Sequence, residues 1–169
     1  MNSLFSSFLI LLLAIPTQVA ATGPNASYRL AFSDGNTNAV VDILEAGISQ
    51  CQALDAAYRF DCYRQSYRSA ASKLNGKPDY RDAQQALRQV EKTLKAIVRQ
   101  YGDKAAPAIR VAGKTYKAVA PAAIQTGAAA FSRARTEAVT LLLRANGHAE
   151  LHYARIAAVV GSNKLIIRS

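Results

Sequence analysis

The chain has 169 residues, with 21 Lys or Arg against 11 Asp or Glu, so its formal net charge at pH 7 is +10. This length is sufficient for one domain with a core and too short for two. The charge points to anionic partners or to solubility and carries no information about the fold. We find no catalytic or cofactor-binding motif, so we expect no cofactor and favour a function that is not enzymatic.

Residues 1–21 have the pattern of a cleaved signal peptide. A short apolar run at 8–15 is broken by Pro16, and Val19 and Ala21 occupy the minus-three and minus-one positions of a small-residue cleavage site. The run is too short to cross a bilayer comfortably, and an uncleaved anchor or a buried helix is the alternative. We therefore expect cleavage after Ala21, export to the periplasm or the medium, and no transmembrane span in the mature chain.

The cysteines are Cys51 and Cys62, an even number that predicts a disulfide in an exported protein. In one unbroken helix they would lie about 16 Å apart along the axis. A disulfide requires Cα atoms within about 7 Å of each other. The chain must therefore turn between them, and Asp55 is the candidate N-cap of a new helix there. The alternative is a pair of buried thiols in one long helix.

Residues 22–36 are polar and are expected to form an irregular lead-in, followed by a single helical domain at 37–169. Thr37 or Asn38 is the expected N-cap of the first helix. Gly47, inside that helix, either weakens it or lets another helix come close.

The second helix follows Asp55 and ends at 75–76, where Asn and Gly both tolerate left-handed backbone. Tyr63 and Tyr67 lie one turn apart on it beside arginines. Such a pair can stack on bases or sugars. More often it packs at the margin of a core with its hydroxyls in water, and we favour that interpretation.

The stretch 79–101 has the clearest pattern in the chain. Pro78 prevents the second helix from continuing, Asp79 is the expected N-cap of this one, and Gly102 stops it. Its short connection to the second helix predicts antiparallel packing. Its apolar residues recur at alternating steps of four and three, which is the pattern of a helix facing a core. The basic stripe, about half a turn away on the same helix, consists of Arg81, Arg88, Lys92, Lys95 and Arg99.

Residues 103–121 are irregular and basic. The alternation at 109–116 is weak and fits either a small hairpin or an extended crossover, and we favour a loop. A further helix starts near Pro121 and ends at 146–147. The last helix covers 148–160, with Leu151 on its buried side, and an apolar tail at 164–168 is expected to dock on the bundle. Together these patterns predict an all-α bundle of four to five helices, with one disulfide in the first helical hairpin.

His148 and His152 are four residues apart on the last expected helix, which is the spacing of two metal ligands on one face. Glu150 lies between them and points elsewhere, so a third ligand must come from another helix. The order also differs from the HExxH motif of metalloproteases. A metal-binding helical protein is therefore an alternative interpretation.

A small enzyme with an unrecognised site is a further alternative. No serine lies in a nucleophile motif. The spacing of the acidic residues selects no pair for general acid and base catalysis. The candidates are Asp42, Glu45, Asp55, Asp61, Glu91 and Glu137.

The basic stripe is the surface feature most suggestive of function. Beyond the first turn of its helix, Glu91 is the only acid, so the cations are poorly neutralised along the helix. We expect an exported, non-enzymatic protein that binds an anionic partner through this face. The favoured partner is an anionic envelope surface, made of lipid head groups, lipopolysaccharide or acidic glycan. An acidic protein is also possible, and nucleic acid is less favoured.

Cys51 and Cys62, followed by Leu74 and Asn75, resemble a stretch of small helical periplasmic proteins of the lysozyme-inhibitor type. The resemblance is confined to residues 51–75. The Asp and Tyr that flank the Leu-Asn pair in that family are absent here, so no function or site residue is carried over.

Overall fold

The computed structural model describes residues 32–163, so the expected signal peptide at 1–21 and the tail at 164–168 lie outside the described residues. Within that range the chain is mainly helical, which confirms the all-α fold. The helices are α2 (Asp34–Gln52), α3 (Ala56–Lys73), α4 (Arg81–Tyr101), α5 (Ile124–Leu143) and α6 (Ala149–Ser162). The short elements are the 3₁₀ turns η1 (Pro78–Tyr80) and η2 (Pro121–Ala123) and the strands β1 (Ile109–Val111) and β2 (Lys114–Tyr116).

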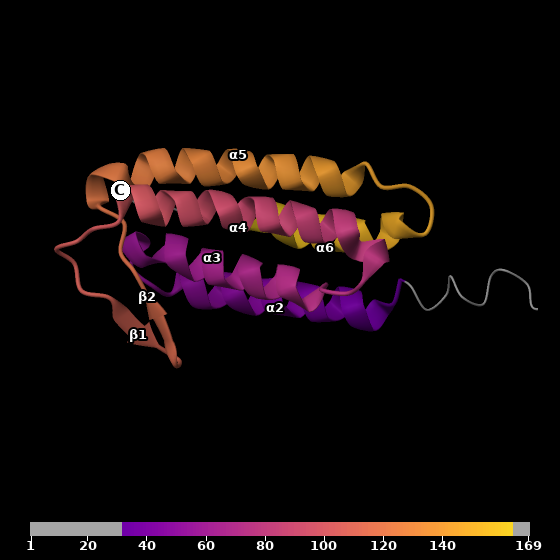
Figure 1. Ribbon diagram of the computed structural model, residues 1–169, viewed down its shortest axis with the longest axis horizontal. Coiled ribbons are helices and arrows are strands. Elements are labelled where there is room, and N and C mark those ends of the chain that lie inside the picture. The colour runs from indigo at the N-terminus through magenta and orange to yellow at the C-terminus, as the bar shows by residue number, and fades with distance from the viewer. Residues whose placement is uncertain (1–31, 164–169) are drawn as a thin grey trace, which may run out of the picture.

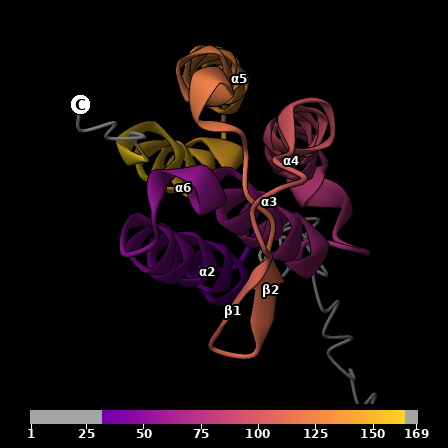
Figure 2. The same cartoon turned by 90° about the vertical axis from the view of Figure 1, so that its left-hand side faces the viewer.

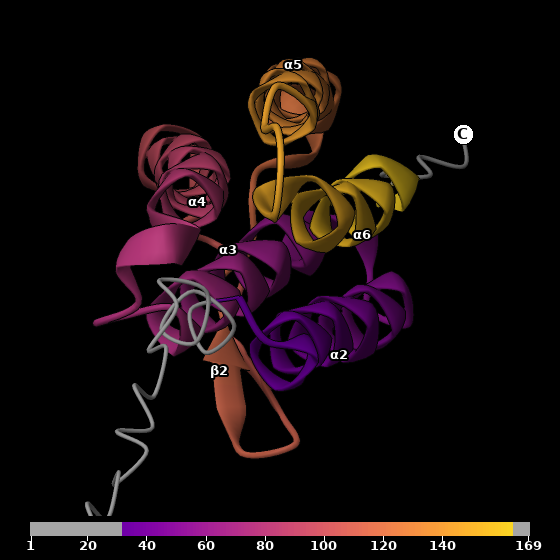
Figure 3. The same ribbon diagram turned by 90° about the vertical axis from the view of Figure 1, so that its right-hand side faces the viewer.

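The five helices lie roughly side by side along one axis, with the β-hairpin at one end (Figure 1). Each helix packs on its neighbours in the chain, and α6 returns to α2, which closes a ring. Seen from the hairpin end, α4 and α2 lie on opposite sides of the bundle (Figure 2). The view from the other end shows the same order around the ring (Figure 3). No helix in the range 32–163 combines the length and hydropathy needed to cross a membrane.

The turn between α2 and α3 carries the predicted disulfide. Cys51 and Cys62 are bonded, with their Cα atoms 5.5 Å apart. The turn that this bond requires is made at Asp55, whose carboxylate accepts a hydrogen bond from the backbone N–H of Ala57 at 2.9 Å. Both the bond and the predicted N-cap are therefore confirmed.

Gly47 lies where α2 and α3 approach most tightly. A Cβ atom built at this position would be 2.3 Å from Oγ and 2.6 Å from Cβ of Ser66 on α3. These distances are shorter than real Cβ contacts, so any larger residue would force the two helices apart. Of the two explanations offered for Gly47, close helix approach is the one that the structure supports.

The start of α2 differs from the prediction. The helix begins at Asp34, and its N-cap is Ser33, whose side chain accepts from the N–H of Asn36. The irregular lead-in was expected to extend to residue 36, with Thr37 or Asn38 as the cap. Thr37 is instead fully buried inside the helix, because its hydroxyl is needed in a tertiary network described below.

The α4 helix follows the predicted pattern over its whole length. The apolar residues Leu87, Val90 and Leu94 are fully buried, and Gly102 follows the last helical residue. Its start differs, because Asp79 lies in η1 and α4 begins at Arg81 without a side-chain cap. The buried apolar face anchors α4 in the bundle and fixes the direction in which its opposite face points.

Three other expectations are wrong in detail. Residues 109–116 form an antiparallel hairpin, with Ile109 opposite Tyr116, where a loop was favoured. Tyr63 and Tyr67 are 1% exposed and lie within the core, not at its margin. Leu151 is 78% exposed, because α6 turns Tyr153 and Ile156 toward the bundle instead.

Candidate functional site

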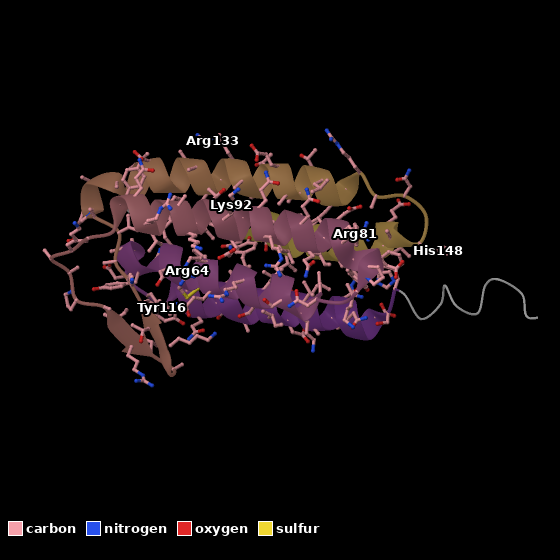
Figure 4. The ribbon with its side chains drawn as sticks, viewed as in Figure 1. Arg64, Arg81, Lys92, Tyr116, Arg133 and His148 are labelled. Carbon is pink, nitrogen blue, oxygen red and sulfur yellow. A yellow bond between two sulfur atoms is a disulfide. The ribbon has the colours of Figure 1, made fainter. Side chains whose placement is uncertain are left out.

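All five side chains of the basic stripe are exposed on the outer face of α4. Arg81 and Lys92 lie along this helix in Figure 4, and Arg64 lies on the neighbouring α3. Because the opposite, apolar side of α4 is buried in the core, the stripe faces away from the bundle. The structure thus brings the predicted cations together on one face, as the helical spacing implied.

Among residues 32–163, no ion pair joins a stripe cation to an acidic side chain. Two ion pairs occur within residues 32–163, Arg64 with Asp61 and Arg155 with Asp34, and neither involves the stripe. Arg88 donates a hydrogen bond to the side-chain oxygen of Asn75 at 3.0 Å, a neutral acceptor. The positive charge of this face is therefore available to a partner.

The opposite side of the bundle has the opposite charge. Helix α2 contains Asp34, Asp42 and Glu45 and no Lys or Arg. It lies across the bundle from α4 (Figure 2). The bundle therefore has a charge polarity between these two helices, with α4 as the positive side and α2 as the negative side, although Asp34 on α2 is paired with Arg155. This property was not predicted from the sequence, because it depends on which helices face away from each other.

The hairpin is fastened to α3 by a buried carboxylate. Asp61 is 3% exposed, and its Oδ2 accepts the backbone N–H of Lys117 at 3.0 Å. Its Oδ1 is 2.6 Å from Nε of Arg64. Gln65 adds a second link by donating to the carbonyl of Thr115 at 2.8 Å. These contacts explain why a hairpin with such short strands is ordered.

Asp61 illustrates how the acidic residues are used. Among the candidate acids named above, Asp61 is the buried one, and it joins α3 to the hairpin. Asp55 caps α3, and Glu137 on α5 accepts a hydrogen bond from Gln89 on α4 at 3.1 Å. These three carboxylates hold elements together, and no contact pairs two of them as an acid and a base would require.

His152 belongs to a network that joins three elements. Nδ1 of His152 is 2.8 Å from Oγ1 of Thr37, which is 2.8 Å from the hydroxyl of Tyr80. The Tyr80 hydroxyl donates to the carbonyl of Ser33 at 3.0 Å, so its single proton is used there. Thr37 must then donate to Tyr80 and accept from His152, which requires a proton on Nδ1. Nε2 is therefore the ring nitrogen left with a lone pair when His152 is neutral.

The two histidines of the predicted pair lie in different surroundings: one is exposed, and the other is packed against an aromatic ring. His148 is exposed at the turn before α6, at the end of the bundle away from Tyr116 of the hairpin (Figure 4). His152 stacks on Phe32, with ring centroids 5.5 Å apart. No group of three or more His, Cys, Asp or Glu side chains is placed to hold a metal within residues 32–163. Metal binding by this pair remains an untested alternative.

A buried arginine was missed by the sequence analysis. Arg135 on α5 is 9% exposed and lies over the ring of Phe131, 5.4 Å from its centroid. Its Nη1 donates to the carbonyl of Gly161 at 3.0 Å and to that of Val160 at 3.3 Å. The cation thus stabilises the negative end of α6, where carbonyls lack helical partners. Burial lowers the pKa of Arg135.

Two tyrosines of α3, Tyr63 and Tyr67, lie close enough to Arg135 to interact with it electrostatically. Tyr63 stacks on Phe131, and burial raises the pKa of Tyr67 to about 12, although a hydrogen bond from Asn163 lowers it. The hydroxyl of Tyr63, Nε of Arg135 and Oδ1 of Asn163 have no hydrogen-bond partner within the described residues. No sequence signal distinguishes Arg135 from the exposed arginines, because its role depends on where α6 ends.

No protein-family model, curated protein or solved structure significantly matches the chain. The resemblance of residues 51–75 to proteins of the lysozyme-inhibitor type therefore gains no support. What can be said about function rests on the geometry and charge of the chain itself.

Proposed function

We propose that this is an exported, non-enzymatic protein that attaches to an anionic envelope surface through the basic stripe of α4. The observation that carries the proposal is the exposure of all five stripe cations on one helix face, without an acidic side chain paired to any of them within residues 32–163. Each Lys or Arg near an anionic lipid surface contributes roughly 1 kcal/mol to attachment. Five aligned cations would together contribute about 5 kcal/mol, which is sufficient for reversible binding.

The charge polarity of the bundle favours one orientation on such a surface. Helix α4 would face the anionic head groups, and the acidic helix α2 would face away from them (Figure 2). Attraction at one side and repulsion at the other both favour this arrangement, so a randomly oriented encounter is disfavoured. A flat array of anions fits this polarity better than a partner that surrounds the protein.

Attachment would be electrostatic, without insertion of α4. The apolar residues of this helix form the core, with Leu87, Val90 and Leu94 fully buried, and none is free to enter a bilayer. Binding that relies on exposed charges weakens as salt shortens the Debye length, from about 30 Å at 10 mM to about 8 Å at 150 mM. The protein would therefore be peripheral and released by salt.

Orientation can be measured with a single label on each side of the bundle. Gln85 on α4 and Ser49 on α2 are both exposed and are suitable for replacement by Cys. Cys51 and Cys62 are bonded to each other and do not react with a thiol label under oxidising conditions. On vesicles that contain anionic lipid and a nitroxide head-group quencher, we expect quenching of a fluorophore at Gln85→Cys and little change at Ser49→Cys.

Two outcomes of this labelling would contradict the proposal. One is equal quenching at the two positions, which would mean that the polarity does not orient the protein. The other is no quenching at either position together with no binding, in which case the partner is an acidic protein, a nucleic acid or none. Vesicles of neutral lipid with the same quencher are the control and should quench neither label.

A further inference from the structure

A cavity of about 440 Å³ opens beside the last turn of α4. This end of α4 lies at the end of the bundle that carries the hairpin (Figure 1). This volume is within the range of small-molecule sites in proteins, about 300–1,000 Å³. Part of its wall is apolar and is formed by Val98, Ala106, Ala108 and Ala118. The cavity therefore offers contact to a ligand that is not purely ionic.

The same cavity is strongly cationic. Arg99, Lys104 and Lys117 line it against one carboxylate, Asp103. Arg99 and Lys104 flank the end of α4, and Lys117 follows the hairpin, so the fold brings two separate stretches of the chain together at this cavity. The carboxylate of Asp103 already accepts the backbone N–H groups of Ala105, at 2.8 Å, and of Ala106. An anion that enters the cavity is thus close to three cations and to one carboxylate, which already accepts hydrogen bonds from two backbone N–H groups.

The frame of the cavity is fixed on both sides. The N–H of Asp103 donates to the carbonyl of Ala118 at 2.9 Å, and the N–H of Ala120 donates to that of Tyr101 at 2.8 Å. These bonds tie the end of α4 to the segment that follows the hairpin. Asp61 holds the backbone of Lys117 from the other side. A site whose backbone is held before binding loses less entropy when a ligand enters.

The far wall of the cavity is also anchored. The hydroxyl of Tyr58 on α3 donates to the carbonyl of Pro107 at 2.8 Å, between the wall residues Ala106 and Ala108. The N–H of Val119 donates to the carbonyl of Ala57 at 2.9 Å. The loop after α4 is therefore fixed to α3 by a hydrogen bond, although it has no regular secondary structure of its own.

We propose that this cavity binds a small amphiphilic anion, namely a carboxylate or phosphate monoester that carries a short apolar group. The acidic group would lie between Lys104 and Lys117, and the apolar group would lie against Val98 and Ala106. The inference goes beyond the membrane contact and does not depend on it, because the stripe residues Lys92 and Lys95 do not line the cavity. Arg99 is common to the cavity and the basic stripe.

Titration calorimetry with hexyl phosphate tests the proposal, with inorganic phosphate and 1-hexanol as probes of each half of the ligand. We expect saturable binding of hexyl phosphate and affinities about tenfold or more weaker for the two partial ligands, because each lacks one kind of contact. The double variant Lys104→Gln/Lys117→Gln should weaken hexyl phosphate binding by about tenfold or more, since charge-assisted contacts are the stronger ones.

A matched control comes from the neighbouring hairpin. Arg110 and Lys114 are exposed and do not line the cavity, so Arg110→Gln/Lys114→Gln removes the same charge elsewhere. It should leave hexyl phosphate binding unchanged, and Ala108→Phe, which fills the cavity without changing the charge, should abolish it. Absence of saturable binding to the native protein, or equal loss in the two charge variants, would overturn the proposal.

Two further measurements separate this site from the stripe and identify the source of its ligand. Lys92→Gln/Lys95→Gln should bind hexyl phosphate as the native protein does, so failure of the membrane proposal leaves this one standing. If the natural ligand is a lipid head group, hexyl phosphate should compete with anionic vesicles for the protein. If it is a free anion, vesicle binding should persist when the cavity is saturated.

Discussion

Replacing Lys92 and Lys95 with Gln is expected to weaken binding to anionic vesicles by about 30-fold. Each cation near an anionic surface contributes roughly 1 kcal/mol. The loss of two therefore costs about 2 kcal/mol, and each 1.4 kcal/mol corresponds to a factor of ten in affinity. Both side chains are exposed, so the fold should be unaffected. Arg99 is left in place because it also lines the cavity beside the end of α4.

The control for this variant is an equal loss of charge outside the stripe. Arg133 on α5 and Arg144 at its end are exposed, and Arg133→Gln/Arg144→Gln gives the same net charge. Figure 4 places Arg133 on the helix next to the one that carries Lys92. We expect this control to lose less than threefold in affinity, which reflects the reduced net charge alone. Similar losses in the two variants would mean that net charge, and not the stripe, drives binding.

Reduction of the disulfide is expected to lower the free energy of unfolding by about 2–3 kcal/mol. The bond closes a short loop between α2 and α3, and the constraint on the unfolded chain accounts for an effect of this size. Urea unfolding followed by circular dichroism, with and without reductant, measures it as a shift of the midpoint. Because the chain contains two cysteines, reductant acts on this bond alone.

The double variant Cys51→Ala/Cys62→Ala is the matching control for reduction. It should unfold near the midpoint of the reduced protein, and reductant should not shift it further. An unchanged midpoint after reduction of the native protein would contradict the role given to the bond. It would also indicate that helix packing around Gly47 holds the first hairpin together without the cross-link.

Elements whose sequence pattern repeats over many residues could be predicted, and short elements held by residues distant in sequence could not. Helix α4 was predicted closely because its apolar stripe repeats over many turns. The disulfide was predicted from the even number of cysteines and the expected export of the chain, and the turn that it requires lies at Asp55. The hairpin was missed because strands of three residues carry almost no periodic signal. It is held by Asp61 and Gln65 of α3, which are distant in sequence.

The N-cap of α2 was predicted wrongly for the same reason, because contacts with distant residues decide it. Thr37 has the chemistry of a cap, but its hydroxyl is used by Tyr80 and His152, which come from other elements. Ser33 caps α2 instead. Leu151 was assigned to the core because it is apolar and suitably spaced. The helix buries the larger Tyr153 side chain, whose hydroxyl donates to the carbonyl of Asp79 at 2.6 Å, and leaves Leu151 in solvent.

For the candidate site, the sequence indicated the cations of α4 but not their surroundings. Spacing along one helix is sufficient to align Arg88, Lys92 and Lys95. The sequence shows that α2 is acidic, but only the arrangement of the helices shows that α2 lies across the bundle from α4. The cavity also depends on the tertiary structure, because Lys104 and Lys117 line it together only when backbone bonds tie the end of α4 to the segment after the hairpin.

Co-sedimentation with vesicles is the most direct test of whether the protein attaches electrostatically to an anionic surface. The protein is mixed with vesicles of neutral lipid, or of neutral and anionic lipid, at about 10 mM and about 150 mM salt, where the Debye length differs several-fold. We expect the protein to sediment with anionic vesicles at low salt, to be largely released at the higher salt, and not to sediment with neutral vesicles. Binding to both lipids with no effect of salt, or binding to neither, would contradict this expectation.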